Sequence, residues 1–345
     1  MTTEPDGKKS AAGAAAASSK PPGYPEHDKL GPLPSPAIPP RGLPLAGGDL
    51  RAAILAAFKE SLDRAQRAAD GGASNLDESV HEYRKSLRRA RAVLGLVAET
   101  LSDHDGDDIA DALRTARRAV AASRDHSVAP AALASLELDA SNRATADAIV
   151  AAARAAAPAA EEVQRLLREG ATVAATTENM LAAALPPELD WKMLADGLAE
   201  TYRSARRQLR KAKRSRRSLH AWRRRTKELS YQLDLVAAGA GDEVGGLAKR
   251  VNDVSDQLGD VVDLVMVRDF IAANATGLDA AVLGAAVDGA LQDRARAARR
   301  AGKELFDRGG RRFARRLTKA VRRDLAPAPP SPAGNGVGLS SESSS

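Results

Sequence analysis

Two stretches of the chain place one histidine and several cations on the same face of a predicted helix. The first contains His81 and the second contains His220. Basic residues follow each histidine at spacings of three, four and seven, which share a face because a helix turns about 100° per residue. These cations are Arg84, Lys85 and Arg88 in the first stretch, with Arg91 three residues after Arg88 on the same face, and Arg223, Arg224 and Lys227 in the second. A guanidinium can hold phosphate oxygens through two parallel hydrogen bonds, so the pattern is typical of a surface that binds phosphate chains.

Two further sets of cations with helical spacing extend this predicted surface. They are Arg203, Arg206, Arg207 and Arg210 before the second histidine, and Arg312, Arg315 and Lys319 near the C-terminus. Several such stripes that converge on one groove would create a strongly positive potential. Each stripe could instead be a solvated helix face, and for the C-terminal set the two interpretations are equally open.

The two histidines have three possible roles. They could pack as neutral residues at the edge of the apolar face, or they could join the anion site, where a nearby anion raises a histidine's pKa. They could also bind a metal or accept a phosphoryl group, but neither has a second histidine four residues away. Asp125 and Asp263, on later predicted helices, are expected to support the basic face by pairing with a cation or capping a helix. No catalytic motif is apparent, so we expect binding without turnover, with no metal and no cofactor.

The composition indicates a helical protein with a polyanionic partner. The 345 residues carry a net charge of +7, only 3% are aromatic, and there is no cysteine. Clustered positive charge favours a nucleic acid, an acidic lipid or a phosphate polymer as the partner. No apolar run is long enough to span a membrane, and the N-terminus lacks the strongly apolar core of a signal peptide, so we expect a cytoplasmic protein without a membrane partner.

The two histidine stretches must lie on helices, and the periodicity predicts these. The expected helices cover about 49–70, 76–99, 107–123, 142–168, 190–214, 218–238, 247–273, 280–307 and 310–323. No segment alternates with the period of a strand, which favours an all-α fold. Residues 102–107 are expected to form a polar turn, Gly170 to end the fourth helix, and residues 239–246 to form a loop.

The helical region is predicted to consist of two halves between unstructured ends. The histidine stretches align at a constant offset, with Tyr83 corresponding to Trp222, and such a repeat indicates a duplicated unit. Adjacent prolines mark the expected join between a first half, 49–187, and a second half, 188–325. The ends, 1–48 and 326–345, are rich in Pro, Gly, Ala or Ser and are expected to be disordered arms.

These residues resemble the CHAD family, whose name stands for conserved histidine α-helical domain. Its members carry a His-x-x-Arg-x-x-x-Arg/Lys helix in each half, which His81, Arg84 and Arg88 match here, as do His220, Arg223 and Lys227. Arg124-Asp125 and the segment 258–264 are similar to the family's aspartate-bearing helices, and segment 202–207 resembles its Tyr-Arg-x-x-Arg-Arg element. The resemblance spans 49–325. It implies two pseudo-symmetric four-helix bundles, binding of inorganic polyphosphate along a basic groove where the halves meet, and association with polyphosphate granules.

Two other functions remain open at this stage. A helical nucleic-acid-binding protein would use the same basic faces, although the scarcity of aromatic residues argues against a platform that stacks single-stranded bases. An enzyme that acts on phosphate chains could use a histidine as the phosphoryl acceptor.

Overall fold

The computed structural model describes most of the helical region. The described residues are 42–45, 47–71, 75–121, 129–130, 132–134, 136–155, 158–212, 215–275 and 280–324. Helices and their connections account for all of these residues, and no strand occurs among them. The expected C-terminal arm lies outside the described residues, as does the expected N-terminal arm up to residue 41.

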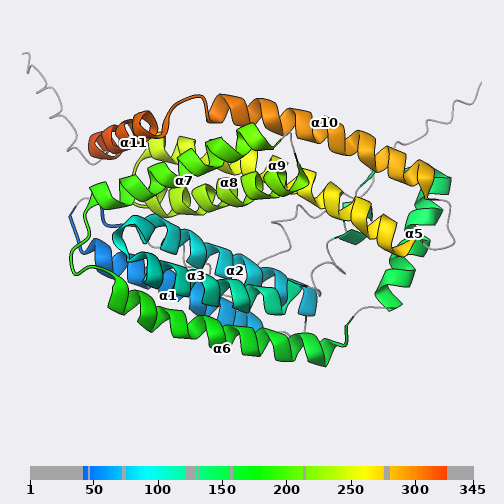
Figure 1. Cartoon of the computed structure of the whole chain (residues 1–345), viewed down its shortest axis with the longest axis horizontal. Helices are drawn as coiled ribbons and strands as arrows, with labels where there is room; N and C mark the ends of the chain where they lie inside the picture. Colours follow the sequence, from blue (N-terminus) through cyan, green and yellow to red (C-terminus); the bar gives the residue numbers. More distant parts are fainter. Residues whose placement is uncertain are drawn as a thin grey trace, which may run out of the picture. The chain divides into compact units, whose positions relative to one another are not determined.

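The first bundle contains four helices that pack around a shared apolar core (Figure 1). These are α1 (Leu50–Asp70), α2 (Leu76–Val97), α3 (Asp103–Ala119) and α6 (Ala160–Ala184). The side chain of Asp49 accepts a hydrogen bond from the amide of Ala52 at the start of α1, and Asn75 does the same for Glu78 in α2. Such caps satisfy amide groups that have no partner within the helix.

The second bundle repeats the four-helix arrangement and adds a short fifth helix. It contains α7 (Trp191–Lys211), α8 (Arg216–Ala237), α9 (Asp242–Asn274) and α10 (Ala281–Leu305), and α11 (Gly310–Asp324) packs against α7 and α9. Helix α5 (Ala140–Ala155) precedes α6 in the chain but contacts α9 and α10 (Figure 1). The predicted all-α fold with two four-helix bundles is confirmed.

The bundles meet where α2 packs against α7 and α8, so the two histidine helices are neighbours. A Cβ added to Gly95 of α2 would lie 2.5 Å from Oε1 of Glu228 in α8. The Gln232 side chain of α8 donates a hydrogen bond of 3.0 Å to the Ala92 carbonyl. A Cβ at Gly197 of α7 would lie 2.1 Å from the Leu96 carbonyl oxygen. Glycines therefore allow the two bundles to approach each other closely at this junction.

Two predicted helix starts are wrong for the same reason. Helix α3 begins at Asp103 with Ser102 as its cap, within the expected turn at 102–107, and α9 begins at Asp242, within the expected loop at 239–246. Acidic residues in these first turns made both segments resemble solvated loops. The same residues stabilise a helix start because its N-terminal end carries partial positive charge.

The predicted fourth helix, 142–168, is also wrong, because this region forms parts of two helices. Helix α5 ends at Ala155 and α6 begins at Ala160, with Pro158 in the connection, where proline cannot continue a helix. Gly170 does not end a helix but lies inside α6. A Cβ there would lie 2.3 Å from the Tyr83 hydroxyl, so the glycine serves close packing against α2.

Candidate anion-binding site

Arg84 connects α2 to the end of α3. It is buried, and its Nη1 lies 3.4 Å from the carbonyl oxygens of both Arg117 and Val120. The neighbouring Tyr83 hydroxyl donates to the Ala116 carbonyl at 3.1 Å. Carbonyls in the last turn of a helix lack partners within it, and a cation there is favoured by the helix dipole. Arg84 thus has a clear packing role in this structure.

The other predicted residues of α2 lie along a half-buried face. His81, Lys85, Arg88 and Arg91 are all half-buried. Lys85 forms an ion pair with Glu82 at 3.4 Å, and Nε of Arg88 donates to the Arg84 carbonyl at 3.3 Å. The half-buried position of His81 is compatible both with packing and with contact to an anion, so its role stays a prediction.

Arg91 belongs to a group of four arginines from three helices, which we call the central arginine cluster. Its members are Arg91 from α2, Arg114 from α3, and Arg224 and Arg225 from α8. Burial lowers the pKa of the Arg91 guanidinium; Glu228 opposes this shift, and the other three arginines add to it. Arg225 pairs with Glu228 at 2.8 Å, and Arg114 pairs with Asp111 at 2.5 Å. Positive charge from both bundles therefore accumulates at one place, where a bound anion would relieve the repulsion.

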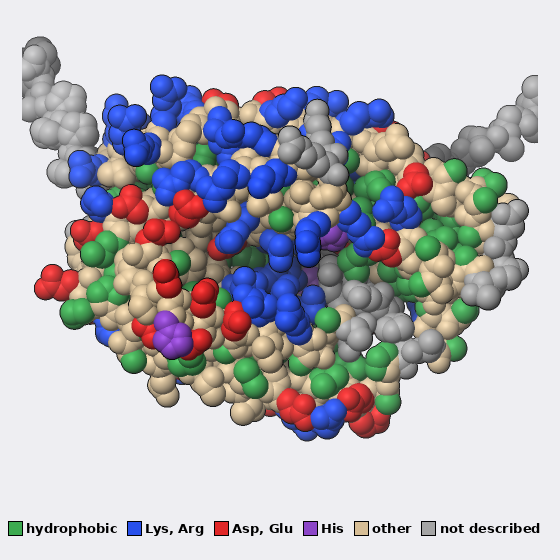
Figure 2. All heavy atoms as spheres, in the orientation of Figure 1, with side chains coloured by type: hydrophobic (Ala, Val, Ile, Leu, Met, Phe, Trp, Pro, Cys, Tyr) green, Lys and Arg blue, Asp and Glu red, His purple; other side chains and the backbone are tan. Residues whose placement is uncertain are grey.

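The cluster lies within a broader basic region of the surface. Figure 2 shows Lys and Arg side chains gathered in the middle of one face, between α2 and α3 of the first bundle and α7 and α8 of the second. Asp and Glu side chains lie beside this region over α3. On this face, Lys and Arg side chains therefore gather at the junction of the two bundles.

The remaining predicted residues of α8 lie between the cluster and α9. His220 and Arg223 are half-buried, and a Cβ at Gly259 would lie 3.9 Å from Nη2 of Arg223. Lys227 pairs with Asp256 at 3.4 Å. Asp263 follows Gly259 by one turn of α9 and is half-buried, which suits the supporting role expected of it. The other expected supporting residue, Asp125, lies outside the described residues.

Of the predicted cations of α7, one bonds to a neighbouring segment and two pair with a carboxylate of the same helix. Nε of Arg206 donates to the Phe306 carbonyl at the end of α10 at 2.9 Å. Arg203 and Arg207 both pair with Glu200, at 2.7 and 2.8 Å. Arg210 is exposed and forms no ion pair within the described part of the chain. Arg210 is thus the member of this set whose charge is most available to a ligand.

The cations of α11 form a basic face of their own. Arg312, Arg315 and Lys319 are exposed, whereas Phe313 and Leu317 pack against the bundle. In Figure 1, α11 lies at one end of the second bundle, away from the junction with α2 and α3. The structure therefore does not bring these three cations to the central arginine cluster.

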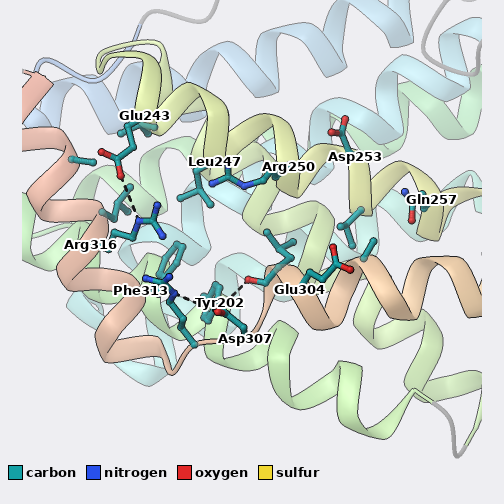
Figure 3. Close-up of a pocket in the computed structure, with 17 residues that line it drawn as sticks. Tyr202, Glu243, Leu247, Arg250, Asp253, Gln257, Glu304, Asp307, Phe313 and Arg316 are labelled. Carbon is teal, nitrogen blue, oxygen red and sulfur yellow. Dashed lines mark hydrogen bonds and ion pairs between the residues drawn. The ribbon is translucent and has the colours of Figure 1, made fainter.

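A pocket of about 470 Å³ between α9, α10 and α11 has a different character (Figure 3). Its apolar wall includes Leu247 and Phe313, but its rim carries both signs of charge. Glu243 pairs with Arg316 at 3.4 Å across this pocket, and Glu304 and Asp307 also line it. The carboxylates would repel a polyanion, so this pocket is not the site that the basic helices predict.

Two kinds of site are not found in the described part of the chain. No group of three or more His, Cys, Asp or Glu side chains could hold a metal ion there. Within the same residues, no helix is long and apolar enough to cross a membrane.

Sequence reasoning missed Arg114, Arg225 and Glu228. Arg114 lies on a helix where no basic stripe was predicted, and Arg225 lies within a basic run but outside the arc that was assigned to the site. Only the packing of α3 against α2, and of α2 against α8, brings these residues together. No spacing within a single helix could have revealed this arrangement.

Comparison with known proteins supports the fold. A family model described as the CHAD domain matches residues 56–272. The crystal structure of the CHAD domain from the plant Ricinus communis aligns with a TM-score of 0.54 and 21% sequence identity, covering 76% of this chain and 93% of that one. Comparison with curated proteins finds no significant match.

Proposed function

Because this chain belongs to the CHAD domain family and its two bundles bring cations to one junction, we propose that it binds inorganic polyphosphate there. The observation that carries the proposal is the central arginine cluster, in which Arg91 feels the positive charges of Arg114, Arg224 and Arg225 and the negative charge of Glu228. A phosphate chain carries negative charge on every unit, so it could contact several of these arginines at once. His81, His220 and Lys227 lie on the same helices and would extend the contact.

The electrostatics explain why a polymer is favoured over a single phosphate. Cations that are clustered in the free protein repel one another, and each phosphate that binds among them relieves part of that repulsion. Several linked phosphates do this without a separate loss of translational freedom for each unit. We therefore expect affinity to rise with chain length until the basic region is covered.

The first experiment is a competition for binding. The full chain is titrated with long-chain polyphosphate at near-physiological salt, in the presence of DNA, RNA or orthophosphate at equal phosphate concentration. Tight binding that only polyphosphate displaces is the expected result. Equal displacement by DNA or RNA would instead favour a nucleic-acid-binding protein, because the same basic faces could serve it.

A pair of matched double variants tests whether the cluster is the site. Arg91→Gln with Arg224→Gln removes two charges from the central arginine cluster, and Arg312→Gln with Arg315→Gln removes two from the face of α11. We expect the first pair to weaken polyphosphate binding much more than the second. Equal losses would show that binding depends on net charge and has no localised site.

Binding is proposed to occur without turnover. Long incubation of the protein with polyphosphate should therefore leave the chains intact, as judged by gel electrophoresis and by assay of orthophosphate. Sustained release of orthophosphate that disappears in His81→Ala or His220→Ala would identify a histidine-dependent enzyme instead. In cells that store polyphosphate, the tagged protein should collect at polyphosphate granules, and the Arg91→Gln/Arg224→Gln variant should not.

A further inference from the structure

A second pocket, of about 420 Å³, lies at the start of α8, and residues of α8, α9 and α10 line it. Leu219, Val265 and Leu291 give it an apolar floor. Four arginines also line it, namely Arg216, Arg268, Arg296 and Arg299, and none of the described residues in its lining is acidic. None of these residues belongs to the central arginine cluster. The pocket thus combines apolar surface with concentrated positive charge.

Three of the four arginines have carboxylate partners outside the pocket lining. Arg216 forms two hydrogen bonds with Asp269, Arg268 lies 3.6 Å from Asp288, and Arg296 pairs with Asp293. All three pairs are substantially exposed to solvent, so they neutralise the arginines only in part. Their guanidinium groups keep further donors that a ligand could use.

Arg299 differs from the other three because it forms no hydrogen bond or ion pair within the described part of the chain. Its Nε is completely enclosed and lacks an acceptor. An enclosed donor without a partner destabilises the folded protein, and more so when the group is charged. Arg299 as a whole is only half-buried, so its other guanidinium N–H groups are the donors that an oxygen acceptor in this pocket would use.

The start of α8 adds a further attraction for an anion. Ser215 caps this helix by accepting a hydrogen bond from the Ser218 amide at 3.2 Å, and Ser215 and Arg216 both line the pocket. The N-terminal end of a helix carries partial positive charge, which favours a negatively charged group nearby. The N-terminal end of α8 therefore attracts an anion, as the arginines do.

We propose that this pocket binds a small organic oxyanion with an apolar body, such as an alkyl phosphate or an aliphatic carboxylate. The anionic head would bind Arg299 with help from its neighbouring arginines, and the aliphatic body would cover Leu219, Val265 and Leu291. The volume lies within the range of small-molecule sites. A polyphosphate chain does not suit the pocket, because it has no apolar part and its charged units would lose water against the floor.

The test uses octyl phosphate below its micelle-forming concentration, with the full chain and isothermal titration calorimetry. Methyl phosphate supplies the same head without the apolar body, and decanoate supplies a carboxylate head. We expect one saturable site for octyl phosphate, with methyl phosphate at least tenfold weaker. The comparison with decanoate then shows which head group is preferred. Binding of methyl phosphate as tight as that of octyl phosphate would overturn the role of the apolar floor.

Two neighbouring arginines on α10 provide matched variants. Arg299→Gln removes a half-buried guanidinium that lines the pocket, whereas Arg300→Gln changes an exposed residue that does not line it. We expect at least a tenfold loss of affinity for octyl phosphate in the first variant and little change in the second. Equal affinities would overturn the proposal. Thermal unfolding of both variants checks that Arg299→Gln remains folded. Leu291→Ser is a further variant that removes part of the apolar floor. It should weaken the binding of octyl phosphate and leave the binding of methyl phosphate unchanged.

A spectroscopic readout locates the ligand. The chain has two tryptophans, and Trp222 is buried in the same apolar cluster as Leu219, Val265 and Ala295, whereas Trp191 bonds to Thr318 of α11. Octyl phosphate should shift the indole N–H signal of Trp222 in an NMR spectrum and leave that of Trp191 in place. Equal shifts of both signals, or binding seen only with anionic lipid vesicles and not with monomeric octyl phosphate, would contradict a discrete pocket here.

Discussion

At the scale of single residues, we expect Arg224 to contribute to polyphosphate binding and not to the stability of the fold. It is exposed, and it adds to the repulsion around Arg91. Arg224→Gln should therefore weaken polyphosphate binding by about 1 kcal/mol, roughly fivefold, without lowering the melting temperature of the free protein. Calorimetric titration and thermal unfolding at low salt measure the two effects. A lower melting temperature would show that Arg224 serves the fold.

Arg84 should behave in the opposite way, although its position after His81 first suggested a ligand contact. Arg84→Gln would leave the carbonyls of Arg117 and Val120 without their buried donor, so we expect a loss of about 2–3 kcal/mol of unfolding free energy. Urea unfolding measures this loss. Lys85→Gln is the matched control, because Lys85 pairs with Glu82 at a half-buried position and should cost much less. Similar losses in both variants would contradict the packing role of Arg84.

Arg84 and Arg224 show what helical spacing can and cannot predict about a single residue. Helical spacing predicted that both lie on basic helix faces, because the spacing depends only on the chain. It could not tell which of them bonds to another helix, since Arg84 is fixed by the end of α3 and Arg224 is not. The same limit explains why Arg114 was missed, since its proximity to Arg91 arises from packing between α2 and α3.

At the scale of elements, Gly170→Ala tests whether close packing between helices outweighs helix propensity. Alanine is favoured over glycine inside a helix by about 1 kcal/mol, so propensity alone predicts that Gly170→Ala stabilises α6. A Cβ would lie 2.3 Å from the Tyr83 hydroxyl and 2.9 Å from the Ala116 carbonyl oxygen, and these two groups are hydrogen-bonded to each other. Overpacking costs about 1–3 kcal/mol, and disruption of this bond adds about 1 kcal/mol. We therefore expect a net destabilisation in urea unfolding.

Gly289 in α10 is the matched control for that substitution. It lies inside a helix, and an added Cβ would have no atom within 4 Å. Gly289→Ala should stabilise the protein by about 0.5–1 kcal/mol, because only the propensity acts there. If both variants were stabilised, α6 would not pack against α2 as closely as described.

Helix boundaries were harder to predict than helix faces. The starts of α3 and α9 were missed because their acidic first turns have the composition of a loop, whereas the start of α2 was found from Asn75 and the acidic residues after it. The split between α5 and α6 was missed although Pro158 marks it, since the alanine-rich sequence on both sides continues the helical pattern.

At the scale of the whole molecule, the repeated histidine helix predicted two halves and the resemblance to the CHAD family implied two four-helix bundles, but neither predicted the placement of α5. This helix lies in the predicted first half, 49–187, and packs on α9 and α10 of the second bundle. Its Ile149 is completely buried in a core with Leu264 and Leu283. Repetition predicts what the halves share, and α5 is a feature of one half only.

Because α5 belongs to the first half of the sequence but packs against the second bundle, we expect the two halves to depend on each other for stability. Residues 188–345 produced alone would lose Ile149 and Leu133 from the core around Leu264, at about 1.5–3 kcal/mol for each buried side chain. They would also lose Arg91 and Arg114, and with them half of the central arginine cluster. We expect this fragment to aggregate or unfold readily and to bind polyphosphate weakly, whereas co-production with residues 1–187 should restore a monodisperse complex and tight binding. Size-exclusion chromatography and calorimetric titration measure both outcomes. A fragment 188–345 that was monomeric, stable and bound polyphosphate as tightly as the full chain would place the site within the second bundle alone and remove the role of the junction.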